Sequence, residues 1–217
     1  ESRIQTVMVP GENAREAAIV SGIASYGVSS LTEAVNYLKT LDERTPVKIN
    51  GEELLKQNME YSMDFSEING QKTVKRAAEV AAAGFHNLLY IGPPGSGKTM
   101  AAKRIPTILP ALTLQESVEL SKVYSIAGLL PAGEALITKR PFRNPHHTMS
   151  AVSLVGGGRT PKPGEISLAG KGILFLDELP EFQRETLEIL RQPLEDRRVV
   201  ISRVYGTYTY PADFQLI

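Results

Sequence analysis

Eight consecutive residues in the middle of the chain have the types and spacing of a phosphate-binding loop. The run Gly92-Pro93-Pro94-Gly95-Ser96-Gly97-Lys98-Thr99 matches the pattern G-x-x-x-x-G-K-S/T, in which glycines let backbone N–H groups point at phosphate oxygens. Lys98 would bring a positive charge to the β- and γ-phosphates, and the Thr99 hydroxyl would bind Mg²⁺. An apolar segment precedes the run and a helix is expected after it, as this chemistry requires. The pattern predicts a site for ATP and Mg²⁺ that also includes Met100; an ordinary Gly/Pro turn is the alternative.

Two adjacent carboxylates, Asp177 and Glu178, follow a second apolar segment at 173–176. In a parallel α/β sheet, ligands bind at the carboxyl ends of the strands. Asp177 is expected to hold Mg²⁺, through water, and Glu178 to polarise the attacking water. Taken alone, the pair could be a solvated strand end. Together with the loop upstream it predicts ATP hydrolysis, with Lys98 and Glu178 as the catalytic residues.

The elements that must position these residues alternate between strand and helix patterns. This alternation predicts an α/β fold with a mainly parallel sheet covered on both faces. Strands are expected at 4–9, 23–28, 87–91, 172–176, 199–203 and 207–217. Helices are expected at 14–20, 31–38, 52–57, 72–83, 99–108 and 184–194. Ser30 and Glu33 suggest a capping box, Gly84 a helix C-cap, and the Pro- and Gly-rich stretch 110–171 an insertion.

Composition sets outer limits on function. The 217 residues carry 24 basic and 24 acidic side chains, so net charge neither favours nor excludes nucleic acid. The chain has no cysteine, which excludes Cys-ligated zinc and fits a cytoplasmic location. No apolar run approaches the roughly 18 residues that span a bilayer, so no membrane partner is expected. Because the chain starts without Met and stops inside an expected strand, we expect it to be part of a longer protein.

Several long motifs make the sequence resemble magnesium-chelatase-type AAA+ ATPases, and within them the bacterial branch called ComM or YifB. The motifs are 87–103, 140–148, 163–169, 177–182 and 190–196. The resemblance implies a P-loop NTPase (AAA+) core at 65–217, truncated before sensor 1 and the lid. It also implies that 1–45 is the end of a Lon-protease-like (ribosomal S5 domain 2-like) α/β domain and that a linker at 46–64 joins this domain to the core. The part of that domain that would house a Ser/Lys dyad is absent from this sequence. For function it implies a hexameric ring motor, which in that branch acts on DNA during recombination in natural transformation.

The resemblance places Ile68 and Gln71 where AAA+ proteins contact adenine; helix capping by this turn is the alternative. Lys139, Arg140 and Arg143 form the most basic stretch, with Arg159 and Lys162 further on. They are candidate DNA or subunit contacts, a subunit contact being preferred for Arg143, and a solvated loop is the alternative. For His146 and His147 a metal pair is disfavoured, because adjacent side chains point apart on a strand and no acidic residue or cysteine lies at ligand spacing.

Other functions stay open at this point. The chain could belong to a magnesium-chelatase-like metal-insertion motor, which would need a partner that binds a porphyrin-like substrate. It could also belong to a chaperone-like remodelling ATPase, or hold ATP without hydrolysing it.

Overall fold

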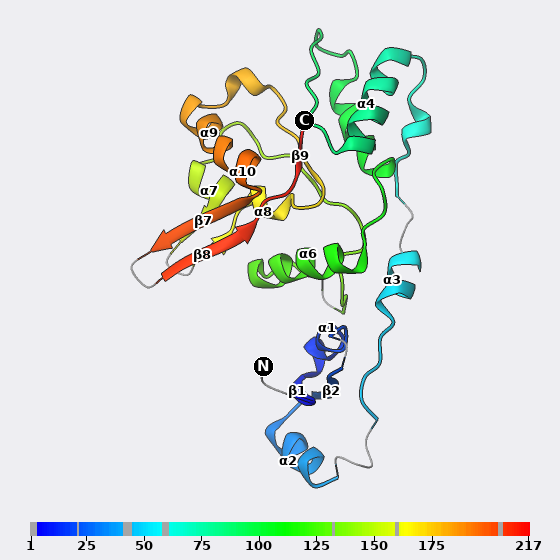
Figure 1. Cartoon of the computed structure of the whole chain (residues 1–217), viewed down its shortest axis with the longest axis vertical. Coiled ribbons are helices and arrows are strands. Elements are labelled where there is room, and N and C mark those ends of the chain that lie inside the picture. The colour runs from blue at the N-terminus through cyan, green and yellow to red at the C-terminus, as the bar shows by residue number, and fades with distance from the viewer. Residues whose placement is uncertain are drawn as a thin grey trace.

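The computed structural model describes residues 4–20, 22–40, 45–57, 61–131, 133–158, 161–203 and 206–217. A small N-terminal part and a larger part lie one after the other along the long axis (Figure 1), and the segment that carries α3 (Gly51–Gln57) joins them. Arg159 of the basic stretch lies outside the described residues. No described helix has the length and hydropathy needed to cross a bilayer.

The N-terminal part is the expected β-α-β-α unit. Its strands β1 (Thr6–Pro10) and β2 (Ala24–Val28) pair in parallel, and α1 (Ala14–Ala17) lies between them in the chain, three residues shorter than expected at its end. Helix α2 (Leu31–Lys39) starts as predicted, with Ser30 Oγ accepting from the Glu33 N–H at 3.2 Å. The Glu33 carboxylate, however, accepts from the Ser29 N–H, so only half of the predicted capping box forms.

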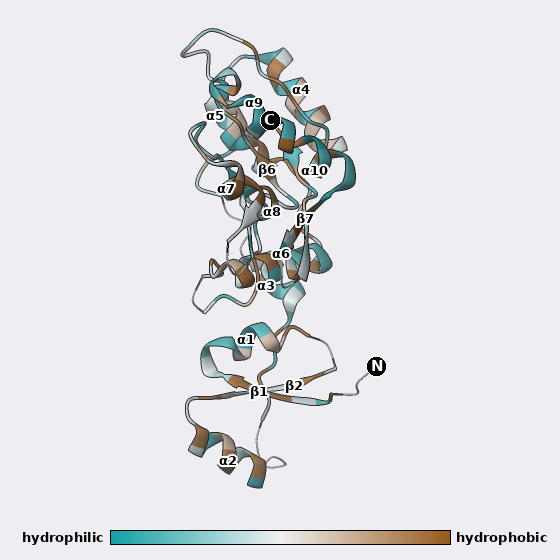
Figure 2. Ribbon diagram, turned by 90° about the vertical axis from the view of Figure 1, so that its left-hand side faces the viewer, coloured by the Kyte–Doolittle hydropathy of each residue, from teal (hydrophilic) through white to brown (hydrophobic). Residues whose placement is uncertain are grey.

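This part buries little of its own apolar surface. Among residues 4–20 and 22–40, only Ala14, Ser25 and Tyr26 are buried. Helix α2 shows brown, hydrophobic stretches between hydrophilic ones in Figure 2, and its Leu31 is 82% exposed and Leu38 70%. The main core therefore lies in the larger part of the molecule.

The central sheet of the larger part is parallel, with the order β3-β6-β9. Its strands are β3 (Phe142–Arg143), β6 (Ile173–Leu174) and β9 (Gln215–Leu216). The segment before the phosphate loop runs beside β9, where the Leu88 N–H donates to the Leu216 carbonyl at 2.9 Å. The strand predicted at 87–91 was wrong: this segment forms no regular strand, and Leu89 is 65% exposed and Ile91 89%.

Alternate residues of the extended segment 173–176, which begins with β6, face two different hydrophobic clusters, as the two-residue period of a strand requires. Ile173 and Phe175 pack on one face with α4 (Lys72–Gly84) and α5 (Lys98–Arg104). Leu174 and Leu176 pack on the other face, with residues of the second half of the chain. The second cluster is covered by α7 (Ala151–Val155), α8 (Glu165–Leu168), α9 (Arg184–Ile189), α10 (Arg191–Asp196) and β7 (Arg198–Arg203). Helices thus cover both faces, and the predicted α/β fold is confirmed.

Proline and backbone geometry move several predicted helix ends. Gly84 is the last residue of α4, and Phe85, not the glycine, takes the left-handed conformation at φ 52°. The helix expected at 99–108 ends at Arg104 and continues as η4 (Ile105–Thr107), since Pro106 has no N–H to donate. The helix expected at 184–194 divides into α9 and α10, because the ring of Pro193 would clash with the Ile189 carbonyl.

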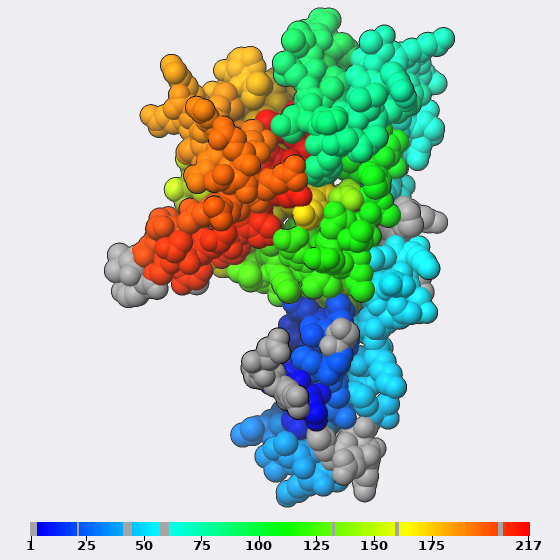
Figure 3. Space-filling model, in the orientation of Figure 1, coloured from blue at the N-terminus to red at the C-terminus, as the bar shows by residue number. Residues whose placement is uncertain are grey.

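The stretch expected to be an insertion is in fact structured and supplies a strand of the central sheet. It contains β3 and the 14-residue helix α6 (Leu114–Ala127), which starts with a capping box between Thr113 and Glu116. It also contains a short hairpin of β4 (Gly156–Gly157) and β5 (Lys162–Pro163). The strand expected at 207–217 is two strands, β8 (Gly206–Pro211) and β9; β8 pairs with β7 in an antiparallel hairpin that projects from the body (Figure 3).

Candidate nucleotide-binding site

The phosphate-binding loop has the backbone conformation that its glycines allow. Gly95 and Gly97 have φ values of 76° and 86°, in the left-handed region that side-chain-bearing residues rarely adopt. A Cβ on Gly92 would lie 3.0 Å from Ser96 Oγ, so the start and the end of the loop approach each other closely. The loop therefore folds back on itself and leads directly into α5 at Lys98.

The Lys98 side chain lies inside this curve. Its ammonium donates to the Gly92 carbonyl at 2.8 Å and to the Pro93 carbonyl at 3.0 Å. Met100, also predicted to contact nucleotide, is 43% exposed, and its Cε lies 3.6 Å from the position of a Cβ on Gly97. The side chain that would reach the phosphates is thus already at the concave side of the loop.

The end of β6 meets the start of α5. Thr99 Oγ1 donates to Asp177 Oδ2 at 2.8 Å, although the two residues are 78 positions apart in the sequence. The other Asp177 oxygen, Oδ1, accepts from the Glu178 N–H at 3.1 Å. A hydroxyl and a carboxylate in contact are hard oxygen ligands of the kind that Mg²⁺ takes together with substrate phosphates. Among the described residues no group of three or more His, Asp or Glu side chains is arranged to hold a metal, so phosphate and water oxygens would have to complete the coordination.

Glu178 follows with an unusual backbone. Its φ is 56°, a left-handed value that is uncommon for a residue with a side chain and that clusters at functional sites. Its side chain is 70% exposed, and Glu178 Oε2 lies 3.8 Å from Nδ1 of His147. The turn therefore directs the carboxylate away from the sheet, next to a histidine that the sequence did not connect with it.

One hollow of about 510 Å³ contains the loop lysine and both carboxylates. It is lined by residues 87–92, 175–180 and 216–217, together with Lys98. Its volume falls in the range of about 300–1,000 Å³ typical of ligand sites, and it lies at the carboxyl ends of the parallel strands. The structure thus brings Lys98, Thr99, Asp177 and Glu178 into one site.

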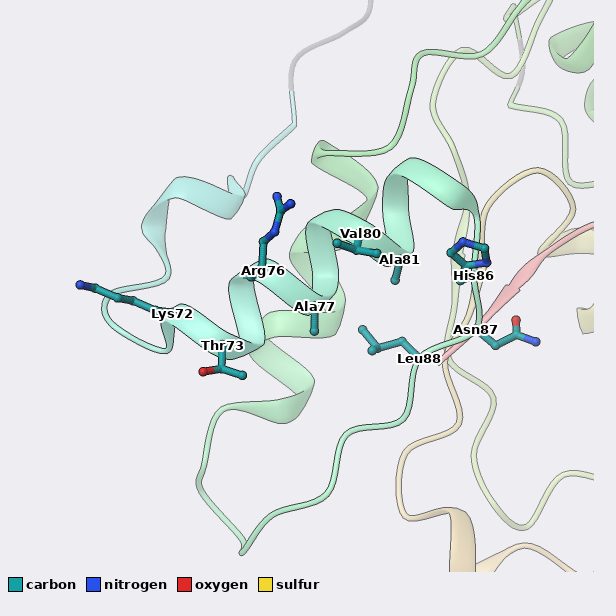
Figure 4. Close-up of a pocket in the computed structure, with 9 residues that line it drawn as sticks. All are labelled: Lys72, Thr73, Arg76, Ala77, Val80, Ala81, His86, Asn87 and Leu88. Carbon is teal, nitrogen blue, oxygen red and sulfur yellow. The ribbon is translucent and has the colours of Figure 1, made fainter.

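The two residues expected near adenine have different environments. Ile68 is 2% exposed and packs in the core with Ala78 and Ile105. Gln71 is exposed, has a left-handed φ of 49° and precedes α4 without capping it through its side chain. A groove of about 700 Å³ between α4 and the segment 86–88 is lined by neither residue (Figure 4). The adenine contact stays a prediction.

The three basic candidates for DNA or subunit contact are not equivalent. The Arg140 side chain is only 8% exposed, and its guanidinium donates to the carbonyls of Pro110 and Lys171 and lies 3.4 Å from a Glu116 oxygen. This burial argues against the predicted external contact and gives Arg140 a structural role. The sequence could not show it, because these acceptors lie about thirty positions away.

Arg143 is partly exposed and paired within the chain. Its Nε and Nη2 each donate to a carboxylate oxygen of Glu165 at 2.6 Å, and the hydrogen bond to Glu165 raises the pKa of Arg143 above its ordinary value. The ammonium of Lys139, an exposed residue, lies 5.5 Å from the centre of the Tyr61 ring. Of the three, Lys139 and Arg143 still reach the surface.

His146 and His147 lie in a turn after β3, not on a strand. Their rings stack with centroids 4.1 Å apart, so the expectation that adjacent histidines point apart was wrong here. His146 Nδ1 lies 2.9 Å from the hydroxyl of Thr148, whereas His147 Nδ1 lies 3.8 Å from Glu178 Oε2.

A comparison with protein-family models decides the family of this chain. Residues 64–217 match the model described as magnesium chelatase, subunit ChlI. The chain belongs to this family. As a member of the magnesium chelatase ChlI family it shows the AAA+ type of α/β fold described above.

Similar proteins support this assignment. The chain is 44% identical over 216 residues to competence protein ComM from Haemophilus influenzae, an alignment that covers 97% of the chain and 42% of that protein. It is 51% identical over 154 residues to the uncharacterized protein YifB from Escherichia coli, covering 71% of the chain and 30% of that protein. The chain thus spans about two fifths or less of the length of these relatives.

A solved structure has the same fold. A model of the complex between subunits BchI and BchD of magnesium chelatase, based on a cryo-EM reconstruction, aligns with a TM-score of 0.56 at 23% identity. The alignment covers 71% of this chain and 53% of that one. At this level of identity the likeness concerns the fold alone.

Proposed function

We propose that this chain is the nucleotide-binding part of an ATP-hydrolysing AAA+ ring motor that acts on DNA. The contact between Thr99 and Asp177 carries the proposal, because it joins the two sequence motifs that an ATPase needs at one point. ATP with Mg²⁺ is the cofactor that this donor set fits. Residues 65–217 form the ATPase core, preceded by a linker at 46–64 and, at 1–45, the end of a Lon-like domain.

Each side chain has a defined task in this proposal. The loop N–H groups and Lys98 bind the phosphates, with Lys98 exchanging its bonds to the Gly92 and Pro93 carbonyls for phosphate oxygens. Thr99 and Asp177 hold Mg²⁺, which neutralises charge on the phosphates when bound. Glu178 accepts a proton from the attacking water, a contribution of about 10²–10⁴ in rate.

DNA as the substrate is supported by the likeness to a protein named for competence, and by the surface position of Lys139 and Arg143. Arg143 suits a contact with a neighbouring subunit in a hexameric ring, because its pair with Glu165 orients the guanidinium. A cytoplasmic location is consistent with this role.

A magnesium-chelatase-like metal-insertion motor is the second candidate, favoured by the description of the family model that matches the chain. The two candidates differ in what stimulates hydrolysis. DNA should stimulate the first, and a large chelatase-type partner subunit should stimulate the second.

Titration of a fluorescent ATP analogue with Mg²⁺ into the chain tests nucleotide binding. Lys98→Ala should abolish binding, whereas Lys103→Ala, an exposed lysine on the same helix, should not. The rate of ATP hydrolysis is then measured in the full-length natural protein, with and without branched DNA at low salt. Loss of binding in Lys98→Ala with DNA-stimulated turnover supports the proposal. Turnover indifferent to DNA refutes the DNA motor, and a folded chain that binds no nucleotide refutes the ATPase.

A further inference from the structure

The segment that precedes α4 is fastened to the helix that follows the phosphate loop. This segment begins with η3 (Phe65–Glu67) and ends in an exposed turn at 69–71. Arg104, the last residue of α5, donates from Nε and Nη2 to Oε2 of the Glu67 carboxylate, at 3.1 and 2.6 Å. Since α5 starts at Lys98, one helix carries the phosphate-binding lysine in its first turn and holds Glu67 from its last.

The Arg104 side chain points in a defined direction. It is only 15% exposed, and its third nitrogen, Nη1, donates to the Met100 carbonyl at 3.1 Å. Met100 and Arg104 are four residues apart and therefore lie on the same face of α5. Met100 Cε in turn lies 3.6 Å from the position of a Cβ on Gly97, at the end of the phosphate loop. The guanidinium thus joins the face of α5 next to the loop to the segment that carries Glu67.

Main-chain hydrogen bonds and burial hold the start of the same segment. The Phe65 N–H donates to Thr107 Oγ1 at 3.1 Å, and the Thr107 hydroxyl donates to the Arg104 carbonyl at 2.8 Å. Phe65 and Ile68 are both buried and pack in the hydrophobic cluster beneath α4 and α5. Glu67 is 49% exposed, and an ion pair with a partner so exposed contributes little to overall stability. We therefore expect its effect to be local, on the place of the turn that follows.

The turn at 69–71 carries the groups that recognise an adenine edge. Asn69 and Gln71 are exposed, and each carboxamide offers a donor and an acceptor, which match the N7 acceptor and N6 donor of adenine. Guanine presents an oxygen where adenine presents this N–H, so the same carboxamide discriminates between the two bases. Contacts of Lys98 with phosphate are common to all nucleoside triphosphates and cannot discriminate. Gly70 and Gln71 have left-handed φ values of 69° and 49°, so the turn is sharp and its direction depends on its anchors.

We infer that Arg104 is a positioning residue for the base of ATP, because its ion pair with Glu67 fixes the turn at 69–71 relative to the phosphate loop. This role rests on the proposed ATPase function and adds to it a residue outside both nucleotide motifs. Arg104 does not touch the nucleotide in this scheme. Its loss lowers the fraction of molecules in which the turn is correctly placed, and the apparent affinity for ATP falls with that fraction.

The KM and kcat of ATP hydrolysis, and the affinities for ATP and GTP with Mg²⁺, are measured in the full-length natural protein. Arg104→Ala should raise the KM for ATP roughly tenfold, the result expected if about one molecule in ten keeps the turn in place, and leave kcat unchanged. The affinity for GTP should change by less than about twofold, so the preference for ATP over GTP falls. Lys103→Ala, the exposed neighbour on α5, is the matched control and should keep both the KM and the preference.

A double-mutant cycle separates the ion pair from a general structural role of Arg104. In a Glu67→Ala background, Arg104→Ala should cause no further loss of preference for ATP, since both changes remove the same pair. An equal loss in both backgrounds, a proportional loss of ATP and GTP affinity, or an unchanged KM in Arg104→Ala overturns the inference and leaves the ATPase in place. Equal affinity of the unmodified protein for ATP and GTP overturns it as well. A folded, unmodified protein that binds no nucleotide refutes the proposed function and the inference with it.

Discussion

Replacing Arg140 by Ala should destabilise the protein by about 3 kcal/mol. The guanidinium donates to the carbonyls of Pro110 and Lys171, lies 3.3 Å from that of Ala111, and is 3.4 Å from Glu116. Each buried acceptor left without a partner costs about 1–3 kcal/mol, and removing one member of a buried ion pair costs about 3–5 kcal/mol. Water entering the space of the deleted side chain would satisfy some acceptors, so we take the lower end of that range.

Urea unfolding followed by circular dichroism measures this effect. With an m value of about 3 kcal/mol/M, a loss of about 3 kcal/mol lowers the unfolding midpoint by roughly 1 M. The thermal midpoint should fall by roughly 6–12 °C for a chain of this size. Arg140→Lys should recover only part of the loss, because an ammonium cannot reproduce the planar fork of a guanidinium.

Lys139→Ala is the matched control, since Lys139 is the adjacent basic residue and is exposed. It should change the free energy of unfolding by less than about 0.5 kcal/mol. If Arg140→Ala unfolds like the unmodified protein and instead loses DNA binding or assembly, the structural role argued here for Arg140 is refuted.

Three further changes test other contacts. Thr99→Val removes the hydroxyl that bonds Asp177 and should slow Mg²⁺-dependent hydrolysis roughly tenfold or more, whereas Thr99→Ser keeps the hydroxyl and should keep the rate. Equal rates for Thr99→Val and the unmodified protein would refute a role of Thr99 in hydrolysis. The Tyr90 hydroxyl is buried without a partner among the described residues, and burial raises the pKa of Tyr90 to about 12. Because the unfolded chain loses this proton near pH 10 and the folded chain only near pH 12, the free energy of unfolding falls as the pH rises from 10 to 12. In urea unfolding at pH 8 and pH 11, Tyr90→Phe should therefore lose less stability at the higher pH than the unmodified protein does. Glu165→Gln weakens the two 2.6 Å bonds to Arg143 and should lower the free energy of unfolding by about 1–3 kcal/mol; an unchanged urea midpoint would contradict this.

Most of the correct predictions rested on local sequence patterns. The glycine spacing of 92–97 predicts a loop with left-handed residues, and the structure has them at Gly95 and Gly97. The apolar run before Asp177 places a strand of the central sheet correctly. The capping box of Thr113 and Glu116 could also have been found, since its four-residue pattern was present in the stretch treated as an insertion.

Errors arose where neighbours distant in sequence decided the outcome. The segment 87–91 has the composition of a buried strand, yet its bonds to β9 are confined to Asn87 and Leu88 among the described residues, and no regular strand forms. The basic character of Arg140 suggested an external contact, and only the fold shows carbonyls around its guanidinium. Composition gives the chemical type of a side chain but not its acceptors.

The sequence by itself determined which residue types are present for the proposed chemistry: a glycine-rich loop for phosphate, a hydroxyl and a carboxylate for Mg²⁺, and a second carboxylate for water. It could do so because each motif is a contiguous run whose backbone requirements are local. The tertiary structure alone decided which of these groups meet. Thr99 reaches Asp177, and His147 reaches Glu178, through the pairing and packing of strands whose register no local pattern encodes.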